Sequence, residues 1–380
     1  MIETASARSL CVAQILPALE EGGVERGTLE IAGALTERGH RALVISAGGR
    51  MVEELKRSGG EHIELPVGVK SPLTLRFVPE LKAILKERRV DIVHARSRLP
   101  AWIAYLAWRT LPKARRPRFV TTVHGLYSVN AYSAVMTRGE RVIAVSEAVR
   151  GYLRDNYPRL DQGKVEVIHR GVDDAIFNPD FKPSRIWIAR FFNDLPQTVD
   201  RFIVTLPGRL SRLKGHEDFL ELITRLVDRG LPVHGLVVGS ARGRDRYEAE
   251  LRADVERRQI PVTFTGSRSD LREIFAVSSA VVSFSQKPES FGRTVNEALA
   301  LGVPVVGYDH GGVGEILAAM FPEGAVPVGN VDAAAEAIER IQSEGLRVTR
   351  PNAFPLSRML DDTIRLYERI APPGTGGRSP

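Results

Sequence analysis

The stretch that decides the fold is PESFGRTVNEALALGVPVV, residues 288–306. It follows the apolar run AVVSFS, turns at Gly292, and then shows the apolar spacing that predicts a helix over 293–301. The run VPVV reads as the next strand, so strand, turn, helix and strand form one unit of a parallel sheet. Glu289 lies in the turn and Glu297 lies on the helix. Because carboxylates accept hydrogen bonds from hydroxyls, two of them around a glycine turn indicate a ligand rich in hydroxyl groups.

The same alternation of short strands and helices runs through the whole chain. Apolar runs such as DIVHAR and RFVTTVHG alternate with helical stretches such as RFVPELKAILKERRV, and a second set begins at RFIVTLPGRL. Alternation of this kind predicts an α/β fold, with parallel sheets covered on both faces and two Rossmann-like domains. We expect these domains at residues 1–183 and 184–356, a final helix at 357–370 and a disordered tail at 371–380.

Length and composition agree with two soluble domains. A chain of 380 residues is long for one core, and no apolar run is long enough for a membrane-spanning helix. The N-terminus reads as a first strand rather than a secretory signal, and Cys11 is the single cysteine, so no disulfide framework exists. These features predict a cytoplasmic protein.

The net charge of +7 comes entirely from residues 1–183, which hold 28 Lys and Arg against 21 Asp and Glu. A basic half can face nucleic acid, anionic lipid or an acidic substrate, and the lack of an aromatic–basic RNA motif or zinc spacing makes nucleic acid the weakest of these. Trp102, Tyr105 and Trp108 precede a run of cations at 109–118. This pattern suits a membrane surface, and it equally suits a packed helix that ends in a solvated basic loop.

Ligands of open parallel sheets bind beyond the carboxyl ends of the strands. Gly22 and Gly23 follow the first strand, and His124 follows RFVTTV. Arg209 and Lys214 follow FIVTLP in the glycine-bounded turn GRLSRLKG. A planar guanidinium and a mobile ammonium five positions apart suit a diphosphate, although solvated cations would read the same way.

Backbone amides supply further candidate anion-binding groups. Those of Ser290, Phe291 and Gly292 lie at the start of the predicted helix 293–301, and helix N-termini attract anions. No Asp-x-Asp pair occurs in the chain, so we expect cations and helix ends, rather than a bound metal, to neutralise phosphates.

With these residues the chain resembles the retaining glycosyltransferases of the GT-B fold and, within them, glycosyltransferase family 4. The most specific element is the E-x7-E motif from Glu289 to Glu297, followed by GRLSRLKG, the GGV turn and DHGGVGEI. The resemblance implies two domains facing across a cleft and a C-terminal helix that crosses back to the first domain. The segment LPALEEGGVERGTLEIAGALTERGH is similar to bacterial enzymes that build lipopolysaccharide or related envelope glycans.

The resemblance also implies a role for each motif residue. Glu289 would meet the hydroxyls of the donor sugar, Glu297 the ribose, and Arg209 and Lys214 the diphosphate. His124 would lie near the donor sugar and the reaction centre.

Glycines and backbone amides complete the implied donor site. Gly22 and Gly23 would let the first domain close on the diphosphate, and backbone near Gly266 would hold the base. Amides near Phe291 and Gly292 would meet the diphosphate as well.

The implied reaction is front-face attack by an acceptor hydroxyl, with the leaving phosphate taking its proton, so that no protein base and no metal cofactor are needed. The expected donor is a UDP-sugar first and GDP-mannose second, with a glycan or lipid-linked acceptor and possible contact with anionic membrane on the inner face of the plasma membrane. The segment VVGSARGRDRYEAEL and His310 depart from the family pattern and leave the donor open. Rival interpretations are a nucleotide-sugar 2-epimerase of the same fold and a non-catalytic sugar-binding protein.

Overall fold

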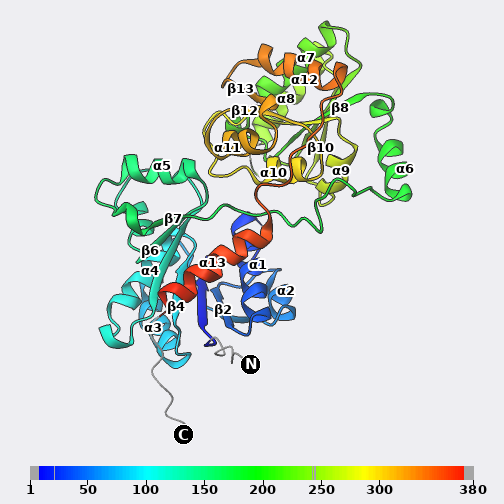
Figure 1. The fold of residues 1–380 in the computed structure, drawn as a ribbon. Coiled ribbons are helices and arrows are strands. Elements are labelled where there is room, and N and C mark those ends of the chain that lie inside the picture. The colour runs from blue at the N-terminus through cyan, green and yellow to red at the C-terminus, as the bar shows by residue number, and fades with distance from the viewer. Residues whose placement is uncertain (1–7, 21, 242, 244, 372–380) are drawn as a thin grey trace. The chain divides into compact units, whose positions relative to one another are not determined.

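The computed structural model of the chain describes residues 8–20, 22–241, 243 and 245–371. The chain divides into two compact units. The first unit comprises residues 1–170 and 357–380, and the second comprises residues 171–356 (Figure 1). Each is an α/β unit built on a parallel sheet, which confirms the predicted fold of two Rossmann-like domains.

The sheet of the first unit has, in its described residues, seven parallel strands in the order β3-β2-β1-β4-β5-β6-β7. The strands are β1 (Cys11–Ile15), β2 (Arg41–Ser46), β3 (Glu61–Glu64), β4 (Ile92–Ala95), β5 (Arg118–Val123), β6 (Arg141–Ala144) and β7 (Val165–Val167). The central strands β1, β4 and β5 are almost wholly buried, as expected for parallel strands covered on both faces.

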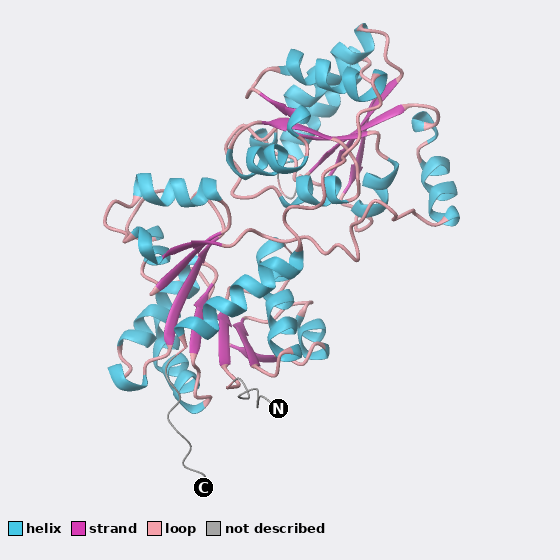
Figure 2. Cartoon of the chain, in the orientation of Figure 1, coloured by secondary structure: helices cyan, strands magenta, loops and turns pink. Residues whose placement is uncertain are grey.

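Helices pack around this sheet (Figure 2). They are α1 (Gly23–Glu37), α2 (Val52–Arg57), α3 (Phe77–Glu87), α4 (Arg98–Arg109), α5 (Glu147–Asn156) and the last helix α13 (Leu356–Ile370). Short 3₁₀ turns lie at Pro72–Arg76, Lys113–Arg115, Ser133–Thr137 and Gln162–Lys164.

The last helix packs on the first unit, as the predicted fold requires. The buried Tyr367 hydroxyl on α13 lies 2.6 Å from His94 Nδ1 on β4, and Thr122 Oγ1 on β5 lies 2.6 Å from His94 Nε2. Arg118 also donates to the carbonyl of Ile370 at 2.9 Å. His94 is therefore a structural residue that fastens α13 to two strands.

The second unit contains, in its described residues, six parallel strands in the order β10-β9-β8-β11-β12-β13. The strands are β8 (Phe202–Pro207), β9 (Val233–Val238), β10 (Val262–Gly266), β11 (Ala280–Ser283), β12 (Val305–Tyr308) and β13 (Ala325–Val326). The helices are α6 (Arg185–Asp194), α7 (His216–Asp228), α8 (Asp245–Arg258), α9 (Leu271–Val277), α10 (Arg293–Ala300), α11 (Gly311–Met320) and α12 (Val331–Ser343). Short 3₁₀ turns lie at Pro196–Thr198, Arg212–Lys214 and Pro322–Gly324.

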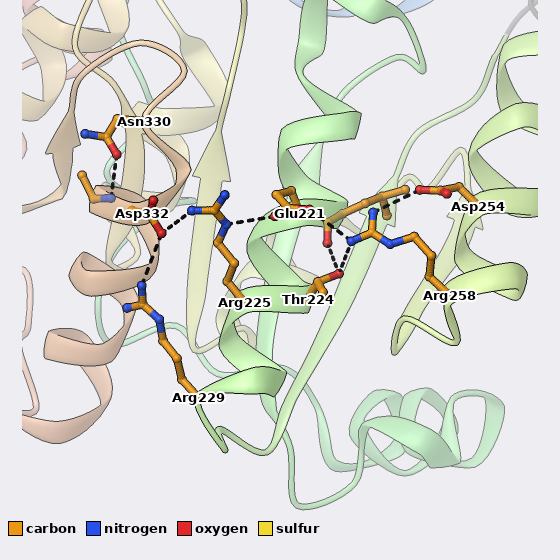
Figure 3. A network of polar contacts seen from close by, with 10 residues as sticks. Glu221, Thr224, Arg225, Arg229, Asp254, Arg258, Asn330 and Asp332 are labelled. Carbon is orange, nitrogen blue, oxygen red and sulfur yellow. Dashed lines mark hydrogen bonds and ion pairs between the residues drawn. The ribbon is translucent and has the colours of Figure 1, made fainter.

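A network of ion pairs ties three helices of the second unit together (Figure 3). Arg225 on α7 contacts Glu221 on the same helix and Asp332 at the start of α12. Arg258 on α8 reaches Glu221 at 3.1 Å. These groups are partly exposed and pair with one another. They hold the three helices together and contribute to the free energy of unfolding only about as much as surface ion pairs do.

The junction between the units lies at residues 170 and 171, whereas the sequence predicted it at 183 and 184. Val172 donates to the carbonyl of Phe354 at 3.1 Å and accepts from the amide of Leu356 at 2.8 Å. This pairing joins residues far apart in the sequence, which places 171–183 in the second unit. The predicted tail at 371–380 lies, apart from Ala371, outside the described residues.

The aromatic segment on α4 is half-buried and packs against the unit. The indole nitrogen of Trp102 donates to the carbonyl of Tyr132 at 2.9 Å, and that of Trp108 donates to Pro117 at 2.7 Å. The Arg116 guanidinium lies 4.5 Å from the Trp108 ring centroid. Of the two interpretations of this segment, the structure favours the packed helix. No helix in the described part of the chain is long and apolar enough to cross a membrane.

Because several histidines are buried, we expect the protein to become less stable as the pH falls. Burial lowers the pKa of His94 and His124 well below the usual value and that of His216 and His234 to about 4. The unfolded chain therefore binds more protons below pH 6.5, so their contribution is present above that pH and is lost as the pH falls toward 4. We expect the midpoint of thermal unfolding to fall by about 2 °C or more per pH unit in this window. A midpoint that stays constant between pH 7.5 and 5 would contradict this prediction.

Candidate active site

Three loops of the second unit meet at an ion pair between two residues predicted from the sequence. Lys214 ends the 3₁₀ turn after β8, and Glu289 lies in the loop after β11. The Lys214 ammonium lies 2.6 Å from Glu289 Oε1, and both side chains are mostly buried, with 31% and 25% exposed. The start of α11, which follows β12, closes the group, because the amide of Gly312 donates to the carbonyl of Glu289 at 2.8 Å.

The surroundings of Glu289 keep its carboxylate charged. Burial alone would raise its pKa, but the Lys214 ammonium and hydrogen bonds from Lys214 and Ser285 outweigh burial, and the pKa lies below the usual value. The Ser285 hydroxyl donates to the same oxygen as Lys214. His310 Nε2 lies 2.7 Å from the carbonyl of Ser285 and donates to it. This hydrogen bond holds the loop after β11 that carries Ser285 and Glu289.

Glycine is required at two positions around this ion pair. Gly215, directly after Lys214, has φ +68°, and a Cβ there would collide with the carbonyl of Phe284. A Cβ on Gly312 would collide with the backbone of Phe291. These two glycines therefore let the backbones after β8, β11 and β12 approach one another at the carboxyl edge of the sheet.

Arg209 and Gly266 lie at the same edge but are not part of the ion pair. The amides on either side of Arg209, those of Gly208 and Leu210, donate to carbonyls of Val238 and Ser240 after β9. The Arg209 backbone is therefore fixed, while its side chain is exposed and makes no ion pair within the described residues. Gly266 ends β10 with φ +72°, and its carbonyl accepts from the amide of Gly239 at 2.9 Å.

Glu297 lies on α10, one turn after the helix begins, and pairs with Arg293 at 2.9 Å. Its side chain is only 12% exposed. Gly292 is the N-cap of α10 with φ +95°, and Phe291 before it is buried beside Phe354. Ser290 lies between Glu289 and Phe291 in the turn before α10. The helix begins at Arg293, where the sequence predicted its start.

A second polar cluster lies at the carboxyl edge of the first unit's sheet. His124 follows β5, and Arg170 follows β7. Arg170 Nη1 lies 3.4 Å from His124 Nδ1, and Arg170 Nη2 donates to the carbonyl of Gly23 at the start of α1. Gly22 caps this helix with φ +138°. Two of the predicted residues, His124 and Gly23, therefore contact one arginine that was not predicted.

Arg96, which follows β4, lies against the same cluster. It is 3% exposed and donates to Gln14 Oε1 at 2.8 Å. A Cβ on Gly27 would lie 3.0 Å from Arg170 Nη2 and 3.2 Å from Arg96 Nη2, so the two guanidinium groups share the space beside the first turns of α1. A cavity of about 20 Å³, room for one water molecule, is lined by both arginines and His124.

Burial, together with these cations, keeps the ring of His124 neutral. Burial and the neighbouring Arg96 and Arg170 hold the pKa of His124 well below the usual value, so its ring is neutral at pH 7. A guanidinium can only donate, so Nδ1 accepts from Arg170 and the ring proton lies on Nε2. A neutral histidine of this tautomer can donate to an oxygen and cannot act there as a charged acid.

Sequence reasoning missed Arg96, Arg170 and Ser285. Each follows the carboxyl end of a strand, in DIVHAR, VEVIHR and AVVSFS. The strand-end rule that found His124 and Lys214 would have found these residues as well, had it been applied to every strand.

Within the described residues, no group of three or more His, Cys, Asp and Glu side chains is placed to hold a metal ion. The charged groups at these strand ends instead suit a ligand that carries both anionic and hydroxyl groups. Lys214 and Arg209 can neutralise an anion, and a charged Glu289 can accept from hydroxyls.

Two α/β units, each with a parallel sheet and charged residues after its strands, are typical of two-domain proteins that bind nucleotides. The family model described as Glycosyltransferase Family 4 matches residues 21–176, and the model described as Glycosyl transferases group 1 matches residues 188–353. Together these segments span most of the chain, which therefore belongs to the GT-B glycosyltransferases of the family 4 type and is an enzyme of the hexosyltransferase class.

Individual proteins agree with this assignment. A glycosyltransferase from Rickettsia africae has a TM-score of 0.83 and 28% identity, over 95% of this chain and 98% of that one. The phosphatidyl-myo-inositol mannosyltransferase of Mycolicibacterium smegmatis is 26% identical over 93% of this chain and 92% of its own length. Anabaena Alr3699/HepE, solved with UDP-glucose, has a TM-score of 0.78 at 21% identity over 95% of this chain and all of its own, a likeness of fold.

Proposed function

We propose that this chain is a retaining glycosyltransferase that moves a sugar from a nucleoside diphosphate sugar to a glycan or glycolipid acceptor. The observation that carries the proposal is the pair of Lys214 and Glu289, 2.6 Å apart at the carboxyl edge of the second unit's sheet. A cation for phosphate and a charged acid for hydroxyls lie side by side there, as recognition of a sugar diphosphate requires.

Departure of the nucleoside diphosphate builds negative charge on the leaving phosphate and positive charge on the anomeric carbon. Lys214, Arg209 and the start of α10 would stabilise the first charge. Fixed groups aimed at developing charge are usually the largest single contribution to catalysis. The acceptor hydroxyl would attack from the face that the phosphate leaves and pass its proton to that phosphate, which retains the anomeric configuration.

The remaining residues take supporting roles in the proposal. Glu297 would bind the ribose after exchanging Arg293, its present partner, for hydroxyl groups, and Gly266 would present backbone to the base. His124, neutral and protonated on Nε2, would donate to an oxygen of the sugar or acceptor. We propose that no metal cofactor takes part, since cations and amides can supply the charge.

The donor, acceptor and cellular role remain parts of the proposal. A UDP-sugar is the first candidate and GDP-mannose the second; a relative of similar length is a mannosyltransferase. We propose an acceptor in lipopolysaccharide or envelope polysaccharide synthesis, and a place at the cytoplasmic face of the membrane. The N-terminal likeness to envelope enzymes and the basic first unit support this role.

A donor panel tests the proposal. UDP, GDP and their sugars are screened by thermal unfolding, and the best donor is then incubated with candidate acceptors. At 100 times its dissociation constant a true donor should stabilise the protein by about 2.7 kcal/mol. The product should keep the donor's anomeric configuration by NMR.

The controls separate the alternatives. The matching nucleoside monophosphate should stabilise the protein less, because it lacks the second phosphate. Formation of an isomeric nucleotide sugar without acceptor would show an epimerase instead. A panel in which no nucleotide sugar stabilises the protein would refute the proposed donor site.

A further inference from the structure

The exposed large apolar side chains of the first unit gather in two loops. Within its described residues they are Val69, Leu73 and Leu75 after β3, and Val129 and Tyr132 after β5. Both loops follow the carboxyl ends of parallel strands, so they belong to the same edge of the sheet as His124. Val69, Leu73 and Leu75 are 52%, 70% and 55% exposed, which is the densest such group in the unit.

This segment, residues 69–76, which we call the apolar loop, holds its leucines outward in a fixed form. Thr74 is buried between Leu73 and Leu75, and its hydroxyl donates to the carbonyl of Val69 at 2.6 Å. The Ser71 hydroxyl accepts from the amide of Leu73 and caps the 3₁₀ turn Pro72–Arg76. The two leucines flank a buried anchor and therefore project into solvent as part of an ordered turn.

Cations and no acids accompany these apolar side chains. Lys70 and Arg76 are exposed within the apolar loop, and residues 65–79 contain no Asp or Glu. The first unit as a whole holds 31 Lys and Arg against 21 Asp and Glu, a net charge of +10. The second holds 22 against 25, a net charge of −3.

We infer that the apolar loop docks the enzyme on an anionic lipid surface, with Leu73 and Leu75 entering the interface and Lys70 and Arg76 meeting the headgroups. Apolar side chains that project beside cations suit such an interface, where burial and charge attraction act together. The positive charge of the apolar loop complements the anionic headgroups of such a surface. The surface differs from the α4 segment suggested by the sequence, because Trp102 and Trp108 are engaged in packing.

The inference deepens the proposed function and rests on it in one respect. If the acceptor is linked to lipid, docking through the apolar loop would bring the first unit to the membrane that holds the acceptor. Binding to lipid is measurable without turnover, so the two can fail separately. The variants below change residues outside the proposed donor site.

The test is cosedimentation of the full chain with vesicles. Wild type should sediment with a phosphatidylcholine–phosphatidylglycerol mixture and much less with phosphatidylcholine alone. The double variant Leu73→Ser/Leu75→Ser should lower the partition coefficient about tenfold or more. Lys70→Glu/Arg76→Glu should abolish the preference for the anionic mixture, and high salt should weaken it in wild type.

A matched control removes exposed apolar groups from the second unit. Ile186 and Val199 are 84% and 46% exposed there, so Ile186→Ser/Val199→Ser should bind vesicles as wild type does. Thermal unfolding of every variant checks folding, and a retained shift with nucleotide sugar checks the donor site.

Three outcomes would overturn the inference. Wild type could stay in the supernatant with both vesicles, or Leu73→Ser/Leu75→Ser could sediment as wild type does. Light scattering could also show a dimer that this variant abolishes, without vesicle binding in wild type. In that case the apolar loop is covered by a second copy of the chain.

Discussion

Replacing Lys214 by alanine is expected to lower kcat/KM for the donor about 100-fold or more while the second unit stays folded. Among the described residues, the Lys214 ammonium is the cation that pairs with Glu289, at 2.6 Å, and the proposed reaction requires it to stabilise the leaving phosphate. Without it, burial is less opposed and the pKa of Glu289 rises, so the acid is also less able to accept from sugar hydroxyls. Because both side chains are mostly buried, the variant leaves the Glu289 carboxylate without its cation and should cost about 1–3 kcal/mol of stability.

A neighbouring cation provides the control. Arg212 lies in the same 3₁₀ turn, is 70% exposed and pairs with Glu217 and Glu250 rather than with Glu289. Arg212→Ala removes the same charge two residues away and should change kcat/KM by less than about fivefold, as expected for a surface ion pair. Equal losses in Arg212→Ala and Lys214→Ala would mean that general charge, rather than the position of Lys214, matters.

The partner of Lys214 should behave in the same way. Glu289→Ala should also lower turnover about 100-fold or more, and the double variant should lose much less than the product of the two single effects. Steady-state kinetics with an established donor measure all three, with thermal unfolding as the check on folding. Near-normal turnover in either single variant would remove the proposed roles of both residues.

The fold was predictable because its determinants are local. Glycine turns between apolar strands and amphipathic helices repeat along the chain, so parallel sheets follow from the sequence alone. The junction between the units was misplaced because the pairing of Val172 with Pro355 joins residues distant in sequence. No local pattern in the Asp- and Pro-rich stretch after residue 172 predicts this pairing.

The site was partly predictable for a related reason. The rule that ligands bind at the carboxyl ends of strands pointed to Lys214, Glu289 and His124, because each lies in the segment that follows an apolar run. That rule did not identify the pair of Arg293 and Glu297, although residues four apart on the predicted helix are neighbours and the pair could have been read from the sequence.

Exposure of apolar side chains was not predictable at all. The sequence left Trp102 and Trp108 open between a membrane surface and a packed helix, and in the structure their indole nitrogens donate to backbone carbonyls. Nothing in the sequence around Leu73 and Leu75 marks them as exposed, yet they project into solvent.

The second large effect is expected at Arg170, which we regard as a positioning residue. Its guanidinium contacts His124 Nδ1 and donates to the carbonyl of Gly23, so one side chain fixes the histidine and the first turn of α1. Arg170→Ala should lower turnover about 100-fold. Arg170→Lys should recover part of it, because an ammonium keeps the charge but lacks the planar fork that reaches both groups.

The pH profile separates positioning from a merely structural role. In wild type the pKa of His124 is held well below the usual value, first by burial and then by Arg96 and Arg170, so His124 should not limit kcat/KM between pH 6 and 8. Removing the Arg170 charge raises that pKa, so a larger fraction of His124 is protonated at pH 6 and Nδ1 can no longer accept. The ratio of kcat/KM at pH 6 to that at pH 8 should therefore fall in Arg170→Ala and stay near the wild-type ratio in Arg170→Lys. Arg159→Ala, which removes an exposed arginine of the same unit, should leave both turnover and profile unchanged. A parallel loss at every pH in Arg170→Ala would instead mean that Arg170 acts through packing alone.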